Sequence, residues 1–328
     1  MSLIKKSNEL SFPTTVKMMI YGQAGMGKTT VALSAPKPLL LDFDNGVKRV
    51  NTSHLENVDI VQVSNWGEIQ TLLQQEQAEL APYSTIVVDT IGKMMDFIIT
   101  HCCGSRQPQI KDWGRINQEF TWFTRALSAL NKNIVFVAHR DTRKEGEETV
   151  FIPSLREKSY NSIVTELDLL GYLEMKSERG VQTRTITFDP TSRNDGKNTC
   201  NLPAVMSIPN ILDKNAQPTA PNTFIAEKII FPYQQMLDIK AEERKRSEDL
   251  IKTITADVEG IVNAATANEF ASKISEYPHA GSSMAKARAL FGAKVKELGL
   301  KYDKDKKVYA DAEPESKPEE TAKSEPAA

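Results

Sequence analysis

Short apolar runs alternate with amphipathic segments over the first two-thirds of the chain. The short runs are typical of buried strands, and the longer segments between them have the apolar spacing of helices. Strands are predicted at residues 16–21, 38–42, 58–63, 85–89 and 133–139, with two later β-like runs at 169–175 and 182–188. Helices are predicted at residues 28–34, 66–79, 91–101 and 113–131. This alternation predicts an α/β fold with a mainly parallel sheet flanked by helices.

The pattern changes near residue 205, where prolines and small polar residues interrupt helices and strands. Amphipathic segments then return at residues 224–255, 257–277 and 282–298, and they indicate a helical C-terminal region. The sequence predicts an N-terminal arm at 1–11, a core at 12–205, a linker at 206–223, a helical region at 224–302 and a disordered acidic tail at 303–328.

The composition is that of an ordinary soluble protein, with 40% hydrophobic and 26% charged residues in 328. We find no apolar run long enough for a transmembrane helix, and the first residues do not resemble a secretory signal. Three cysteines in a chain of this length favour a reducing compartment. We therefore expect a cytoplasmic protein with no membrane partner, in the host cytoplasm if a phage encodes it.

The net charge of −2 does not indicate nucleic-acid binding by the chain as a whole. Residues 311–328 hold six acids and two lysines, so the rest of the chain carries a net charge of +2. Any DNA binding must therefore come from local basic patches.

One motif, Gly22-Gln23-Ala24-Gly25-Met26-Gly27-Lys28-Thr29 followed by Thr30, matches the phosphate-binding P-loop in full. It follows a predicted strand and opens a predicted helix, which is the context that such a match requires. The glycines let backbone N–H groups turn towards phosphate oxygens, and the start of the helix adds to that field. Lys28 can reach the β- and γ-phosphates, and the Thr29 hydroxyl can ligate Mg²⁺. The motif predicts ATP and Mg²⁺ as ligands.

Asp89 ends the apolar run TIVVD and can hold Mg²⁺ opposite Thr29. Its alternative role is to cap the helix that follows. Many ATPases place a water-activating glutamate directly after such an aspartate, and here the next residue is Thr90. Either the general base lies elsewhere, or hydrolysis is poor.

Asp44 is the candidate for that missing base. Asp42 and Asp44 alternate at the end of the strand LLLDFD, so their side chains are predicted to leave it on the same side. In a parallel sheet this strand end faces the crevice that holds the P-loop. The alternative is a simple turn, which Asp-Asn-Gly also favours.

These motifs together resemble the RecA family of P-loop ATPases. They comprise the P-loop, LLLDFDNG, TIVVDTIGKM and IVFVAHRD. Over roughly residues 12–205 the chain resembles, more narrowly, the compact phage RecA-like ATPases classed as nucleotide-binding or single-strand annealing recombination proteins. The resemblance implies that Lys28 and Thr29 contact phosphate and Mg²⁺, and that Asp89 is the metal acid. It also implies that Asp44 is the catalytic base, where the family usually has glutamate.

His139, at the end of the strand IVFVAH, has two possible roles. A neutral imidazole there can hydrogen-bond a γ-phosphate oxygen and transmit its loss to the following segment. It can equally be a histidine paired inside the structure. The resemblance favours the sensor role, because RecA-like proteins place a polar sensor after this strand.

Two loops, at residues 104–115 and 140–158, are predicted to contact single-stranded DNA, because RecA-like proteins bind single strands in these places. Cations neutralise phosphates, and an aromatic ring offers a stacking face. The candidate cations are Arg106, Lys111, Arg115, Arg143, Lys144, Arg156 and Lys158. Trp113 in the first loop serves either as a stacking face or as a core anchor, and four acids weaken the second loop.

Arg193 and Lys197 lie in a polar segment late in the core. Each is either a solvated side chain or a cation inserted into a neighbouring subunit's nucleotide site, as in ring and filament ATPases. The run His101-Cys102-Cys103 lacks the ligand spacing of a structural zinc site. Nucleotide-bound Mg²⁺ is therefore the metal that we expect.

Three functions remain open from the sequence. The first is a DNA-stimulated ATPase that oligomerises as a filament or ring on single-stranded DNA in phage homologous recombination or annealing, with a single-strand-binding protein as a further partner. The second is a nucleotide-dependent switch or assembly factor of the helicase-loader type, with a protein partner and no direct DNA role. The third, a small-molecule kinase, would need an arginine-rich lid that the sequence lacks.

Overall fold

The computed structural model describes residues 13–178, 181–279 and 282–311. The chain divides into two compact units. The first ends at Met236 and the second continues from Leu237, so the division falls inside helix α6 (Phe231–Glu259).

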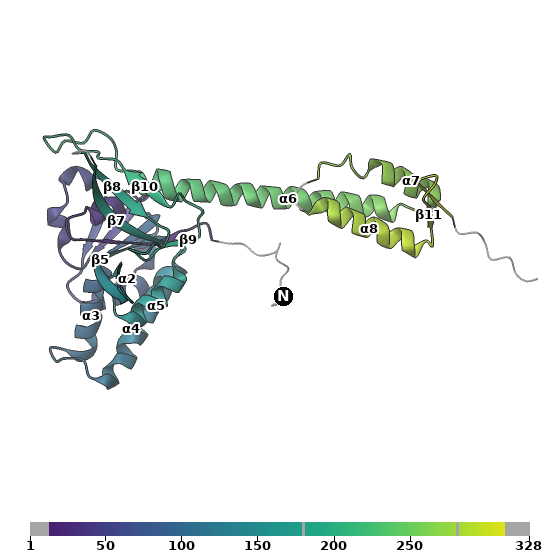
Figure 1. The fold of residues 1–328 in the computed structure, drawn as a ribbon. Coiled ribbons are helices and arrows are strands. Elements are labelled where there is room, and N and C mark those ends of the chain that lie inside the picture. The colour runs from purple at the N-terminus through teal and green to yellow at the C-terminus, as the bar shows by residue number, and fades with distance from the viewer. Residues whose placement is uncertain (1–12, 179–180, 280–281, 312–328) are drawn as a thin grey trace, which may run out of the picture. The chain divides into compact units, whose positions relative to one another are not determined.

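The first unit is built on a large, mainly parallel sheet with the strand order β10-β8-β7-β1-β5-β4-β2-β3 (Figure 1). The strands on this path are β1 (Lys17–Gly22), β2 (Pro38–Asp42), β3 (Asp59–Gln62), β4 (Thr85–Asp89), β5 (Asn133–Glu145), β7 (Leu169–Glu178), β8 (Val181–Thr187) and β10 (Val205–Ile208). Neighbours from β7 to β3 pair in parallel, whereas β8 pairs antiparallel with both β7 and β10. The predicted α/β fold is confirmed.

Helices cover both faces of this sheet. They are α1 (Lys28–Ala32), α2 (Trp66–Gln74), α3 (Ile91–Cys103), α4 (Trp113–Ala129) and α5 (Glu157–Glu166). Helices α2 to α5 share one hydrophobic cluster with the sheet, and α1 shares the other with residues 224–230. Successive residues of β1 alternate between the two clusters, because neighbouring side chains of a strand point to opposite faces of the sheet. Both faces are covered, so the side chains on both are buried.

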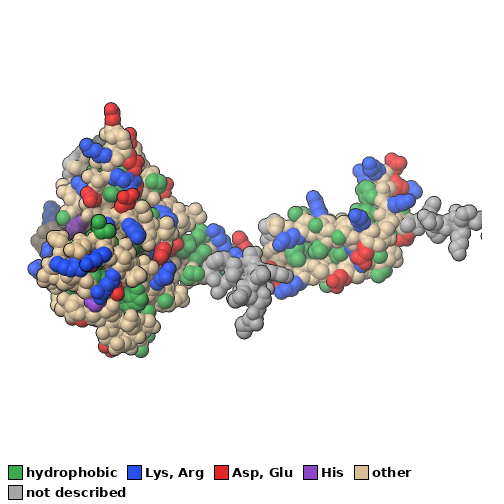
Figure 2. All heavy atoms as spheres, turned by 90° about the horizontal axis from the view of Figure 1, so that it is seen from below, with side chains coloured by type: hydrophobic (Ala, Val, Ile, Leu, Met, Phe, Trp, Pro, Cys, Tyr) green, Lys and Arg blue, Asp and Glu red, His purple; other side chains and the backbone are tan. Residues whose placement is uncertain are grey.

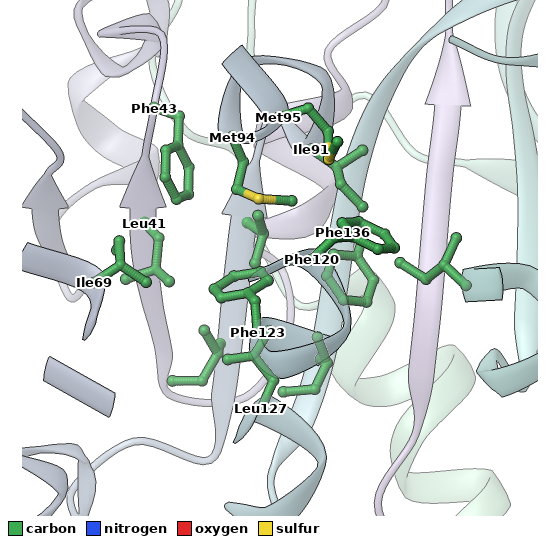
Figure 3. Close-up of a cluster of buried hydrophobic side chains, with 14 of the residues drawn as sticks. Leu41, Phe43, Ile69, Ile91, Met94, Met95, Phe120, Phe123, Leu127 and Phe136 are labelled. Carbon is green, nitrogen blue, oxygen red and sulfur yellow. The ribbon is translucent and has the colours of Figure 1, made fainter. Parts of the chain in front are cut away.

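The larger cluster lies between the sheet and helices α3 and α4 (Figure 3). Met94 of α3 and Phe120 and Phe123 of α4 point towards Leu41 of β2 and Phe136 of β5. These five side chains are at most 3% exposed. This packing fixes β2, β4 and β5 side by side, so their carboxyl ends meet at one edge of the sheet.

The segment after His139 is a hairpin and a helix, and its prediction as a loop was wrong. Strand β5 continues without a break to Glu145, and β6 (Glu148–Pro153) pairs with it antiparallel. Gly146 takes a left-handed φ of 65° in the turn, a conformation that favours glycine. Helix α5 then begins at Glu157.

The predicted linker at 206–223 is partly structured. β10 begins at Val205 and adds to the sheet beside β8. Further on, the Asn222 side chain donates a hydrogen bond to the Thr30 carbonyl (2.8 Å), and the Ile225 N–H donates to the Ser34 hydroxyl (2.9 Å). The segment is therefore fastened to α1 and does not run free.

The second unit contains the rest of α6 with α7 (Ala264–Lys273) and α8 (Ser283–Glu297), followed by a hairpin of β11 (Lys301–Asp303) and β12 (Val308–Ala310). The predicted helix at 257–277 is interrupted after Glu259, where α6 ends. Figure 2 shows Lys and Arg interspersed with Asp and Glu on the visible surface of each unit.

The hairpin corrects the predicted start of the tail at residue 303. Tyr309 packs edge-on against Phe291 at a centroid distance of 5.4 Å, and its N–H donates to the Asn268 side chain (2.7 Å). The Asp311 carboxylate accepts a hydrogen bond from the Ala264 N–H at the start of α7 (2.9 Å). Residues 303–311 are thus part of the second unit, and residues 312–328 lie outside the described residues.

Candidate nucleotide-binding site

The P-loop connects β1 to α1 at the carboxyl edge of the sheet. Gly25 and Gly27 have left-handed φ values of 80° and 78°, which glycine adopts without strain. At Gly22 a Cβ atom would lie 2.4 Å from the Leu173 carbonyl oxygen of β7, so this position has room for glycine alone. The loop therefore has the shape of a cradle whose backbone N–H groups can face an anion.

Lys28 is buried, with 6% of its surface exposed. Its ammonium donates to the carbonyls of Gly22 (3.1 Å) and Gln23 (2.9 Å), which lie in the P-loop itself. Burial lowers the pKa of Lys28, and the nearby carboxylates of Asp89 and Asp44 oppose that shift. The ammonium is thus held at the loop where phosphate oxygens would be received.

Thr29 and Asp89 form the candidate Mg²⁺ site. The Thr29 hydroxyl donates to Asp89 Oδ2 at 2.6 Å, so a hydroxyl and a carboxylate converge from α1 and β4. Hard oxygen ligands of this kind suit Mg²⁺. Burial raises the pKa of Asp89 to about 6, although the Thr29 hydrogen bond opposes the shift.

Thr90 takes the capping role that the sequence left open for Asp89. Its hydroxyl accepts a hydrogen bond from the Lys93 N–H (3.3 Å) and caps α3. The carboxylate of Asp89 is thereby left to face Thr29.

Asp42 and Asp44 have different hydrogen-bond partners. The Asp42 carboxylate is buried and accepts hydrogen bonds from the N–H groups of Gly46 (2.9 Å) and Val47 (3.2 Å), so it shapes the turn after β2. Asp44 Oδ2 accepts from Arg49 (3.1 Å), whereas its Oδ1 is buried without a hydrogen-bond partner. Asp44 therefore has an acceptor atom available at the site.

His139 lies at the carboxyl end of the core part of β5. Burial lowers its pKa, and the positive charge of Lys28 lowers it further. The imidazole is therefore neutral at neutral pH, when it can donate from one ring nitrogen and accept at the other. This is the protonation state that the predicted sensor role requires.

These elements enclose one cavity of about 470 Å³. Its lining residues are Ala24, Gly25, Gly27, Lys28, Thr29, Thr30, Asp44, Gly46, Arg49, Val50, Asp89, Thr90 and His139. The structure thus brings together the predicted phosphate, metal and catalytic residues from four separate segments. Their individual roles stay predictions.

Arg193 and Lys197, the two candidates for insertion into a neighbouring subunit's nucleotide site, differ in their surroundings. Lys197 donates to the carbonyls of Val164 (2.8 Å) and Thr165 (3.1 Å), so its ammonium binds the last turn of α5. This engagement within its own chain argues against insertion into a neighbour. The Arg193 side chain is 68% exposed and lies 4.0 Å from the Glu174 carboxylate, so it remains a candidate.

Three of the seven predicted DNA-binding cations have partners within the chain. Arg106 forms a two-pronged ion pair with Asp112, and Arg143 pairs with Glu145 and Asp195. The third, Arg156, has an aromatic partner, which is described below. The other four, Lys111, Arg115, Lys144 and Lys158, are exposed, and their side chains make no hydrogen bond or ion pair with any described residue.

The two predicted DNA segments meet at Arg156 and Trp113. The Arg156 guanidinium lies over the Trp113 ring at 3.3 Å from its centroid, a cation–π contact between the start of α5 and that of α4. Trp113 is half-buried and also packs against the larger hydrophobic cluster, which agrees with the anchor role.

A shallow groove of about 720 Å³ runs along α4 beside this contact. It is lined by Gly114, Asn117, Gln118, Thr121, Trp122, Arg125, Ala126 and Lys158. We did not predict Arg125, because nothing in the spacing of α4 distinguishes it from any other exposed helix residue.

Arg184 of β8 is a further residue that sequence reasoning missed. A Cβ atom on Gly27 would lie 3.1 Å from its Cζ, so its guanidinium lies directly against the P-loop. The available signal was its alternation with Ile186 and Phe188, which are fully buried on the α1 face of the sheet. A charge in register with two core residues indicates a cation directed inwards.

The chain is similar to several known proteins. The family described as "AAA domain" matches residues 14–200, which is more than half of the chain. The SPβ prophage-derived uncharacterised protein YorG of Bacillus subtilis (strain 168) is 24% identical over 166 residues, which are 47% of this chain and 49% of that protein. The chain thus spans about half the length of this curated relative.

Two solved structures are similar at low levels. A KaiC-like protein from Pyrococcus horikoshii OT3 has a TM-score of 0.34 and 11% identity, covering 52% of this chain and 77% of its own. The flagellar accessory protein FlaH from Methanocaldococcus jannaschii has a TM-score of 0.35 and 11% identity, covering 62% and 93%. In the described part of the chain, no helix is long and apolar enough to cross a membrane.

Proposed function

Because the chain belongs to the AAA domain family, we propose that it binds ATP with Mg²⁺, hydrolyses it, and couples turnover to single-stranded DNA in phage homologous recombination or strand annealing. The prophage origin of its Bacillus subtilis relative supports the phage setting. The proposal has a nucleotide part and a DNA part, which rest on different observations.

The nucleotide part rests on the convergence of Thr29, Asp89 and Asp44 beside the P-loop. The Thr29 hydroxyl and the Asp89 carboxylate would hold Mg²⁺, which supplies positive charge against the phosphates when bound. Lys28 would exchange its P-loop carbonyls for phosphate oxygens. Asp44, with one buried oxygen that lacks a partner, would accept a proton from the attacking water.

The DNA part rests on the groove along α4. Arg125 and Lys158 supply two cations at its walls, and amide side chains and Trp122 supply hydrogen bonds and an apolar face. A groove that combines cations with an aromatic surface suits a flexible single strand. Two further exposed cations lie close in sequence to this groove, Lys111 just before α4 and Arg115 in its first turn.

Assembly and partners complete the proposal. A homo-oligomer, as a ring or a filament, would let the exposed Arg193 of one subunit reach the nucleotide of the next. A single-strand-binding protein is the further partner expected for an annealing reaction. The cytoplasm is the expected location.

One observation favours the second candidate, a nucleotide-dependent switch that acts on a protein partner. Ile110, in the connection between α3 and α4, is 95% exposed. Large exposed apolar side chains are frequent anchors in protein interfaces. Under this alternative the α4 groove and its neighbouring connection would receive a polypeptide.

The deciding experiment is ATP turnover with and without single-stranded DNA at low and at physiological salt. The double variant Arg125→Ala/Lys158→Ala should lose stimulation, and DNA affinity should depend less on salt, by about 0.7 in log–log slope for each lost phosphate contact. The matched control is Lys301→Ala/Lys304→Ala, which removes the same charge from the second unit. Turnover that ignores DNA in the unchanged protein would favour the partner-driven switch.

A further inference from the structure

A second, larger cavity adjoins the nucleotide cavity in the first unit. Its volume is about 740 Å³, within the range of small-molecule sites. Thr30 and Arg49 line both cavities, so the two meet at the start of α1. Its far wall comes from β10 and from the segment that the sequence predicted to be a linker.

Arg184 lies where this cavity meets the P-loop. Its Nε is buried without a hydrogen-bond partner, and no described residue forms an ion pair with it. Burial lowers the pKa of Arg184, and no carboxylate offsets that cost. The residue as a whole is half-buried and lines the cavity, and an anionic partner stabilises a guanidinium that is partly removed from water. The missing partner is therefore expected from outside the chain.

Much of the remaining wall is uncharged. It consists of apolar side chains and amides: Val205, Met206, Ile208, Pro209, Asn210, Ile211, Leu212, Pro221, Asn222 and Phe224. Among its ionisable lining residues, Glu227 alone is acidic, whereas Arg49, His54, Arg184 and Lys228 are basic.

This wall is held in place against the P-loop helix. Ile208 of β10 pairs with Arg184 of β8 in the sheet. The Asn222 side chain donates to the Thr30 carbonyl (2.8 Å), and the Asn51 side chain donates to the Ala216 carbonyl (3.1 Å). The cavity is thus built by hydrogen bonds from three segments and is not a chance gap beside a loose loop.

The positions of the site residues give the direction in which a bound nucleotide would lie. Asp44, Asp89 and His139 lie in the smaller cavity, so the terminal phosphate of a bound nucleotide would point there. Gly27 and Thr30 lie between this end and the larger cavity. A nucleotide whose phosphates follow the P-loop therefore places its nucleoside in the larger cavity.

We propose that the 740 Å³ cavity is the nucleoside site and that Arg184 contacts the phosphates nearest the nucleoside. The wall at residues 205–224 then reads the base, with amides for hydrogen bonds and apolar side chains for its faces. This inference rests on the proposed nucleotide binding and adds to it the part of the chain that selects the nucleotide.

The test compares ATP with inorganic tripolyphosphate by titration calorimetry on the full chain. Ser207→Trp places an indole at the cavity wall and should weaken ATP binding at least tenfold while leaving tripolyphosphate binding unchanged. Arg184→Ala should weaken both ligands, and Arg184→Lys should recover part of the loss. Arg288→Ala, which removes an exposed arginine from α8, is the matched control.

Each outcome bears on a separate claim. If Ser207→Trp and Arg184→Ala both bind ATP like the unchanged protein, the nucleoside assignment is overturned while the P-loop assignment stands. Loss of tripolyphosphate binding by Ser207→Trp would also overturn it, because the cavity would then not be separate from the phosphate site. If the unchanged protein binds neither ligand, the proposed nucleotide function itself fails. Unfolding curves without ligand check that each variant is folded.

Discussion

The Thr29 hydroxyl donates a 2.6 Å hydrogen bond to the Asp89 carboxylate, joining the first turn of the P-loop helix to the end of β4. The two oxygens that we predict to bind Mg²⁺ therefore lie together. The arrangement explains why Thr90 can follow Asp89 without loss of the site, since Thr90 caps α3 and leaves the carboxylate to Thr29.

Mg²⁺-dependent nucleotide binding should weaken as the pH falls through about 6. Burial raises the pKa of Asp89 to about 6, so below that value the carboxyl is protonated and is a poor metal ligand. Calorimetry with Mg–ATP at pH 5.5 and 7.5 measures the effect. Asp89→Asn should bind Mg–ATP weakly at both values, and an unaltered pH dependence in that variant would assign the titration to another group.

The same raised pKa predicts the pH dependence of stability in the absence of nucleotide. A carboxyl whose folded pKa lies above its unfolded value binds protons more tightly when folded, so its ionisation destabilises the fold. The free energy of unfolding should therefore decrease between about pH 4 and pH 6 by the contribution of Asp89. Asp89→Asn should remove that decrease in chemical denaturation experiments, and identical profiles would contradict the assignment.

Asp44→Asn should retain ATP binding and lose hydrolysis by at least about a hundredfold, the usual scale for a general base. The amide keeps the size of the side chain but cannot accept the proton of water. Asp44→Glu, which restores the residue common in the RecA family, should keep activity. Steady-state turnover together with nucleotide affinity separates the two effects, and full turnover by Asp44→Asn would place the base elsewhere.

Gly22→Ala should destabilise the first unit by about 1–3 kcal/mol, because its Cβ would meet the Leu173 carbonyl oxygen at 2.4 Å. Gly114→Ala in α4 is the matched control, since a Cβ there meets nothing within 4 Å. It should leave stability unchanged or raise it by up to about 1 kcal/mol. Urea unfolding of both variants gives the comparison. Equal stabilities would mean that the backbone of β7 shifts to make room for the added Cβ.

A chain truncated after Tyr302 should lose stability in the second unit, by about 3 kcal/mol or more. The cut removes Tyr309 from Phe291 and the Asp311 carboxylate from the start of α7. Truncation after Asp311 keeps these contacts and serves as the control. Thermal unfolding followed by circular dichroism reads the difference, and two superimposable curves would show that the hairpin adds nothing to the unit.

Arg193→Ala should keep nucleotide binding but lose at least about tenfold in turnover if the guanidinium acts on a neighbour's nucleotide. Mixing the Arg193→Ala variant with the Lys28→Ala variant should restore part of the activity. A mixed oligomer contains sites that have both an intact P-loop and the Arg193 of a neighbouring subunit. Lys197→Ala should have no such effect, since Lys197 binds the end of α5. An inactive mixture would contradict the prediction that Arg193 acts on the nucleotide of a neighbouring subunit.

Most of the sheet was predictable because its strands are buried on both faces. The runs that end at Asp42, Asp89 and His139 are almost wholly apolar, and the acid or imidazole after each run marks the edge where the site forms. The P-loop spacing placed Lys28 and Thr29 without any tertiary information. What sequence reasoning could not supply was the pairing of each side chain once it reached that edge.

The errors have specific physical causes. All residues from 141 to 149 in the hairpin after His139 are exposed except the half-buried Arg143, so this part of it carries no apolar periodicity to reveal a strand. The prolines before Phe224 read as a linker, although Asn222 fastens the segment to α1 through a backbone carbonyl that no pattern records. The sequence also did not show that the turn at Gly46 engages Asp42 and leaves one oxygen of Asp44 without a partner.

Strand β5 runs without a break from the central sheet into the hairpin. His139 lies in the same strand as Glu145 at the hairpin tip, and the pairing with β6 stiffens the arm between them. If His139 contacts the γ-phosphate as predicted, the continuous backbone of β5 joins that contact directly to the hairpin turn at Gly146.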